Sequence, residues 1–148
     1  MEDPLGTLIA GMIGGALMGM VFVTHMALLL VFSPPKALQE RAIESDVSKL
    51  ITMASLVMFL GWNMLAIILA FVVQLTRSAE SLANQSISIA PSPVFLFIVL
   101  FITIAISIPA FIFFRDRKQH LLGEILVFLG IFGFLIPNLV VAIQRSNI

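Results

Sequence analysis

The stretch "LIAGMIGGALMGMVFVTH", from Leu8 to His25, decides how the rest of the chain is interpreted. Glycine is disfavoured in an ordinary helix by about 1 kcal/mol relative to alanine. In lipid, however, its missing side chain lets a second helix approach closely, and dispersion contacts then hold the two together. The stretch therefore predicts a membrane-spanning helix with a contact face, which combines four glycines with a histidine: Gly11, Gly14, Gly15, Gly19 and His25.

These residues share one face of the expected helix. At about 100° per residue, Gly15 and Gly19 lie about 40° and 80° from Gly11, while Gly14 and His25 lie about 60° and 40° on its other side. Gly11, Gly15 and Gly19 also form two overlapping GxxxG motifs. Such a face packs within the chain's own bundle, joins copies of the chain, or lies beside a ligand passage. The sequence leaves these three interpretations open.

Composition indicates that the solvent around this chain is lipid. The 148 residues are 60% hydrophobic and only 11% charged, whereas soluble domains are about 45–50% apolar and about 25% charged. The formal net charge is zero and the basic residues are spread among short loops, so a nucleic-acid partner is not expected. The lack of cysteine excludes disulfides, thiolate metal sites and cysteine nucleophiles.

The fold class expected is an all-α integral membrane protein, with one polytopic domain over residues 1–148. A bilayer needs about 20 apolar residues per helix, and backbone in lipid must satisfy its own hydrogen bonds. The acidic start of the chain is unlike a cleaved signal peptide, so the first span is expected to be retained. Four segments are long enough to cross: Thr7–Phe32, Leu50–Leu75, Val94–Phe114 and Leu121–Ile143.

The charges of the loops predict the orientation. Residues 33–49 and 115–120 carry six basic residues, against only Arg77 and Arg145 on the other side. Because cytoplasmic loops are enriched in Lys and Arg, both basic loops are expected to be cytoplasmic and both termini outside, in the cell membrane. Ser33, followed by two prolines, predicts a short surface helix before the second span. The sequon at Asn84 falls on the outer side, and the sequence does not decide whether it is glycosylated.

Polar side chains inside the spans are the candidate functional residues, because they are costly in lipid. On the second span Asn63 and Gln74 lie within about 20° of each other. The amide of Asn63 is interpreted as a clamp to another helix, or alternatively as part of a cavity wall. Trp62 is too deep for an interfacial belt and is expected to pack against a neighbour or face lipid.

The fourth span begins with His120 and Glu124, which lie one helical turn apart. Glu124 is the only acid in the spans, and Asn138 is expected on its face, about 40° away. Under the predicted topology His25, His120 and Glu124 all lie in the inner half and are expected to be able to converge. An imidazole beside a carboxylate forms a structural hydrogen bond or a proton-transfer unit.

Nothing in the sequence predicts an enzyme. It contains no nucleophile elbow, metalloprotease helix or phosphate-binding loop. Two histidines and one glutamate are ligands that a metal accepts, but His25 and Glu124 have no metal-binding spacing, so neither a metal nor a cofactor is expected.

The functional expectation is a non-enzymatic structural or accessory subunit, which packs through the glycine-rich first helix against its own bundle, a partner membrane protein or a second copy. The alternative is a small oligomeric transporter or channel for protons, ions or a small solute, with His25, Asn63 and Glu124 lining the path. A holin-type pore former is a third version. Hydropathy alone does not separate these, because architecture does not fix function.

Overall fold

The computed structural model describes residues 4–32, 47–84, 91–113, 115 and 118–146. This part of the chain forms helices and contains no strand. The surface helix expected before the second span falls on residues 33–46, outside the described residues. In chain order the elements are α1 (Pro4–Phe32), α3 (Val47–Asn84), α4 (Pro93–Phe113), α5 (Lys118–Gly130), the π-helical turn η2 (Ile131–Leu135) and α6 (Ile136–Ser146).

Among the described residues, four helices are long and apolar enough to cross a membrane. The predicted all-helical architecture of four spans is confirmed at this level. The second helix is longer than the span Leu50–Leu75 expected from the sequence, since it begins at Val47 and continues to Asn84. Hydroxyl groups support this extension: Thr76 donates to the carbonyl of Val72, and Ser78 donates to that of Gln74.

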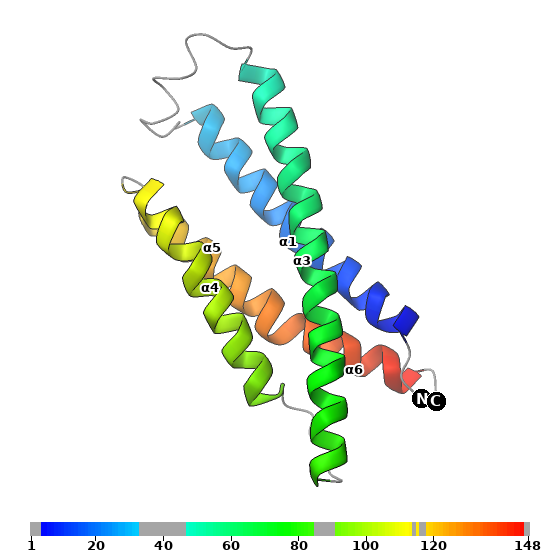
Figure 1. The fold of residues 1–148 in the computed structure, drawn as a ribbon. Coiled ribbons are helices and arrows are strands. Elements are labelled where there is room, and N and C mark those ends of the chain that lie inside the picture. Colours follow the sequence, from blue (N-terminus) through cyan, green and yellow to red (C-terminus); the bar gives the residue numbers. More distant parts are fainter. Residues whose placement is uncertain (1–3, 33–46, 85–90, 114, 116–117, 147–148) are drawn as a thin grey trace.

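The first two helices cross as an antiparallel pair, shown in blue and green in Figure 1. A Cβ added to Gly11 would lie 2.7 Å from the Cα of Ile67, and one added to Gly15 would lie 2.6 Å from the Cα of Asn63. The two backbones are therefore in direct contact along the glycine ridge. This close approach is what small residues permit between helices in lipid.

The last helical segment completes an up-and-down bundle. The α5–η2–α6 rod runs antiparallel to α1, because Glu124 contacts His25 near the end of α1 and Ile136 contacts Gly14 nearer its start. Helix α4 lies alongside α5 (Figure 1). Helix α1 thus packs against α3 and against the last rod, and α4 packs mainly against α5. Helix α1 ends and α5 begins at the same end, which is called here the His25 end.

The π-helical turn η2 keeps the same side of the last rod facing the bundle along its length. Pro137 has no N–H to donate and its ring crowds the carbonyl of Gly133, which accounts for a wider turn at this point. A straight α-helix drifts by about 40° every four residues. The wider turn offsets that drift, so that Glu124, Phe132 and Ile136 all remain buried on the side that faces the bundle.

A single apolar core fills the bundle between these helices. It is richest in aromatic and aliphatic side chains where α3 meets the last rod. Its largest fully buried members are Phe95, Phe132, Met18, Leu69 and Ile136.

Candidate functional site

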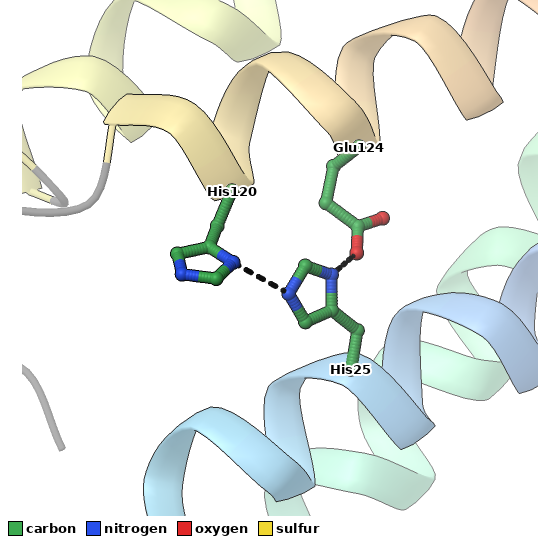
Figure 2. Close-up of polar contacts among 3 residues, drawn as sticks. All are labelled: His25, His120 and Glu124. Atoms are coloured by element: carbon green, nitrogen blue, oxygen red, sulfur yellow. Dashed lines mark hydrogen bonds and ion pairs between the residues drawn. The ribbon is translucent and has the colours of Figure 1, made fainter. Parts of the chain in front are cut away.

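A carboxylate and two imidazoles from two helices meet near the His25 end (Figure 2). His25 comes from α1, while His120 and Glu124 lie one turn apart on α5. The Nδ1 atom of His25 is hydrogen bonded to Oε1 of Glu124. The Nε2 atom of the same ring lies 3.4 Å from Nδ1 of His120. The three side chains therefore form a line with His25 in the middle.

Exposure changes along this line. His120 is exposed, the side chain of His25 is 30% exposed, and that of Glu124 is 10% exposed. The second carboxylate oxygen of Glu124, Oε2, is buried and has no hydrogen-bond partner among the described residues. A buried acceptor without a donor is costly and rare in folded proteins. The line thus leads from an exposed imidazole to a buried carboxylate whose hydrogen bonding is incomplete.

The position of the proton on the His25 ring follows from its hydrogen bond to Glu124. An ionised carboxylate only accepts hydrogen bonds, so Nδ1 of His25 carries a proton and donates it to Glu124. In the neutral ring Nε2 is then an acceptor, and it faces Nδ1 of His120 as the donor. His25 bridges two partners through opposite sides of its ring. This linear arrangement differs from a metal site, and no group of three or more such ligands among the described residues could hold a metal ion.

A pocket of about 110 Å³ opens beside this line, bounded by α1, α3, α4 and α5. Its wall is mainly aromatic, aliphatic and thioether, with the three titratable side chains at one end. Helix α4 contributes Thr103, whose hydroxyl donates to the carbonyl of Val99. The lining residues are Met18, Phe22, His25, Met26, Trp62, Thr103, Ile106, Ser107, Ala110, His120, Leu121, Glu124, Ile125 and Phe128.

An aromatic cluster closes the pocket toward the middle of the bundle. Phe128 and Phe132 stack with ring centroids 4.5 Å apart, and both lie within 6 Å of Trp62, at 5.6 and 5.9 Å. Phe22 meets Trp62 edge-on at 5.2 Å. Phe128 and Phe132 are both buried. An apolar block therefore separates the site from the opposite end of the bundle.

The structure places Asn63 away from this pocket. It lies at the α1–α3 crossing, where its Cα faces Gly15. Its amide was expected to clamp a second helix, but Nδ2 donates to the carbonyl of Phe59 in its own helix. The close backbone contact with Gly15 explains the difference, because at that distance the side chain satisfies its donor one turn back. Trp62, adjacent in sequence, is the residue of this segment that reaches the pocket.

Two further polar candidates also lie apart from the site. Gln74 is buried, with its Oε1 unpaired, toward the opposite end of α3. Asn138 is exposed and donates to the carbonyl of Phe134. The prediction that Asn138 shares the face of Glu124 is wrong, because η2 lies between them and residues after a wider turn lag behind their α-helical positions.

The remaining glycines contact side chains of the same chain. A Cβ on Gly14 would lie 2.4 Å from Cγ1 of Ile136, and one on Gly19 would lie 2.6 Å from Cδ2 of Phe59. Together with the backbone contacts of Gly11 and Gly15, these contacts occupy the glycine face inside the bundle. Sequence reasoning missed the contribution of α4 to the pocket and the aromatic cluster. Only the four-residue spacing of Phe128 and Phe132 signalled the latter.

Comparison with protein-family models, curated proteins and solved structures finds no match for this chain.

Proposed function

We propose that this chain is a multi-pass membrane protein that performs proton-linked transport, with Glu124 and His25 as its protonation site. Four helices of sufficient length and hydropathy support membrane insertion. Lys and Arg gather in the two connections at the His25 end, which supports a cytoplasmic location for that end and an outer location for both termini. The site then opens toward the cytoplasm.

The observation that carries this proposal is the burial of Glu124 against His25 of another helix, beside a pocket. Ionisable side chains within membrane helices are rare, and they mark ion and proton pathways more often than packing contacts. A carboxylate that only clamped α5 to α1 would be expected to satisfy both of its oxygens. Here one oxygen is paired and the other is buried without a donor.

The line of side chains supports transfer of a proton in both directions. A proton that arrives at His120 passes from its Nδ1 to Nε2 of His25. His25 releases its Nδ1 proton to Oε1 of Glu124, so the carboxylate becomes neutral and the His25 ring changes tautomer. Rotation of the rings or the reverse transfer resets the line. Imidazole suits this role, because its charge changes near neutral pH.

Protonation of Glu124 is suited to change the contact between α1 and α5. The His25–Glu124 contact joins α1 to α5 beside the pocket. Neutral Glu124 is a weaker acceptor than its carboxylate, since charge-assisted hydrogen bonds are about twice as strong as neutral ones. Proton uptake therefore weakens the link between α1 and α5 at this end, while η2 and α6 stay packed on α1 and α3, and a local change of this kind is one way in which transporters switch between states.

An accessory-subunit role has less support from the geometry. That hypothesis let the glycine face pack within its own bundle or against a partner or second copy, and the contacts of Gly11, Gly14, Gly15 and Gly19 within the chain support only the first of these. A partner would have to use a different surface. The described residues offer exposed apolar side chains on every span, and surrounding lipid covers such side chains equally well.

Proton flux into liposomes tests the proposal. Purified protein is reconstituted around a trapped pH-sensitive dye, and a potassium diffusion potential drives protons inward. Wild-type vesicles are expected to acidify faster than empty vesicles, and Glu124→Gln and His25→Ala to lose that excess. Asn138→Ala serves as the control, because Asn138 is exposed and outside the pocket. Wild-type flux equal to that of empty vesicles overturns the proposal.

A further inference from the structure

We infer that the pocket beside Glu124 binds a small protonated amine with one apolar ring or short alkyl group, in exchange for the proton. This inference rests on the proposed function, because it names the cargo that the protonation site would carry. The structure supports it in three respects: the size and wall of the pocket, the unpaired oxygen of Glu124, and the balance of charge around it.

The size and wall of the pocket fit one small apolar group. Its volume is about 110 Å³, less than the roughly 150 Å³ of an apolar cavity that holds a benzene molecule in another protein, so a ligand no larger than one ring or a short alkyl group is expected. Phe22, Trp62 and Phe128 supply aromatic surface, while Met18 and Met26 supply flexible thioethers. Aromatic faces attract cations as well as apolar groups, and methionine adapts to irregular ligand shapes.

The unpaired oxygen of Glu124 determines which polar group the ligand must carry. Oε1 is used by His25, whereas Oε2 is buried and lacks a donor. An ammonium group with N–H bonds supplies that donor, whereas a quaternary ammonium carries the charge but no donor. Oε2 is covered in this structure, so the carboxylate must turn about its last torsion to meet the ligand. That torsion is broad and soft in glutamate.

The charges around the pocket favour a cation over an anion. Among the described lining residues the titratable groups are His25 on α1 and His120 and Glu124 on α5, and no Lys or Arg lines the wall. The described lining residues of α3 and α4 are not titratable. With neutral imidazoles the pocket holds one negative charge. A desolvated charge of this kind is stabilised only by an opposite partner or by protonation.

The exchange is balanced in protons and charge. Glu124 in its acid form releases its proton through His25 and His120, and the resulting carboxylate pairs with the ammonium group. One positive charge leaves as another enters. A single carboxylate cannot hold both at once, so acidification is expected to weaken amine binding.

Trp62 provides a direct readout, because it is the only tryptophan and the chain contains no tyrosine. Detergent-solubilised full-length protein is titrated with benzylamine, benzyl alcohol, benzyltrimethylammonium and benzoate, with excitation at wavelengths that only tryptophan absorbs. Benzylamine is expected to change Trp62 fluorescence saturably and to bind about ten-fold more tightly than benzyl alcohol, as one charge-assisted hydrogen bond implies. The quaternary analogue is expected to bind less tightly than benzylamine, and benzoate weakest.

Variants separate charge recognition from simple filling of an apolar space. Glu124→Gln is expected to abolish the preference for benzylamine over benzyl alcohol. Gln74→Leu, a buried amide with an unpaired oxygen outside the pocket, is expected to retain it. Equal affinity for the amine and the alcohol in the wild type overturns the inference, because an apolar pocket filled by a lipid chain would behave in this way. Failure of benzylamine to bind also overturns it.

The outcomes for the site and for the proposed function are distinguishable. Binding is measured without a membrane or a gradient, whereas proton flux requires both. Because one-for-one exchange moves no net charge, the flux arm of this comparison places benzylamine inside the vesicles and uses an inward proton gradient. Amine binding without proton flux under these conditions overturns the proposed function and retains the site as a receptor for amines. Proton flux without amine binding overturns this inference alone.

Discussion

Replacement of Gly15 by alanine tests the contact that holds α1 against α3. An added Cβ would lie 2.6 Å from the Cα of Asn63 and 3.0 Å from the Cβ of Ala66. Carbon atoms are in optimal contact at about 3.5–4.0 Å. The contacted atoms belong to the backbone or are bonded directly to it, so they cannot rotate away. The two helices must therefore move apart by about 1 Å, a gap that forfeits a quarter to a half of each dispersion contact along the crossing.

The expected loss of stability follows from this geometry. Overpacking at a site that cannot adjust costs about 1–3 kcal/mol. Gly61 provides the matched control within α3, because a Cβ there would meet no atom within 4 Å. Gly61→Ala is expected to raise the free energy of unfolding by up to about 1 kcal/mol through helix propensity alone. Because the gain in helix propensity is common to both variants, they should differ by the cost of overpacking, about 1–3 kcal/mol.

The assay is reversible unfolding in mixed micelles, with sodium dodecyl sulfate as denaturant and Trp62 fluorescence as the signal. Trp62 reports the bundle because it contacts aromatic rings of α1, α5 and η2. The transition of Gly15→Ala is expected at lower denaturant than that of the wild type, and that of Gly61→Ala at the same or higher denaturant. Equal midpoints for the two variants would refute close backbone contact between α1 and α3.

Three further predictions concern the last rod. His120→Ala is expected to slow proton flux while the preference for benzylamine over benzyl alcohol is retained, because His120 passes protons to His25 whereas Glu124 supplies the charge that selects the amine; loss of that preference would contradict this role. Phe132→Ala is expected to lower the free energy of unfolding in micelles by about 2 kcal/mol. In an apolar solvent the substitution loses little free energy of transfer, but the cavity that it leaves in the core still costs stability; an unchanged midpoint would argue against the aromatic cluster. Pro137→Ala restores the missing N–H donor, so the π-turn is expected to relax, Glu124 to rotate away from His25 and proton flux to fall in folded protein; wild-type flux would show that the turn does not position the site.

Helical periodicity predicted most of what concerns a single straight helix. The sequence placed the glycines and His25 on one face of α1, and in the structure those glycines contact α3 and α6 while His25 contacts Glu124. The prediction of four helices long and apolar enough to cross a membrane is confirmed among the described residues, because it needs only the length and the hydropathy of each segment. Both inferences need only the rise and the rotation per residue.

Features that depend on a change of helical geometry could not be predicted in this way. Asn138 was placed on the wrong face, because a uniform rotation per residue ignores the π-turn before Pro137. Asn63 was expected to bond across helices, but the close approach of Gly15 leaves its amide bonded to its own helix. The pocket was not foreseen because its wall combines four helices, and no periodicity within one helix encodes how far apart the others lie.

Whether Glu124 takes up and releases a proton is measured most directly by difference infrared spectroscopy of the reconstituted protein between alkaline and acidic buffer. Beyond the bands of the seven other Asp and Glu side chains, the wild type is expected to show a protonated-carboxyl C=O component on acidification that is missing from Glu124→Gln and present in Asn138→Ala. A wild-type spectrum that superimposes on that of Glu124→Gln would contradict a protonation site at Glu124.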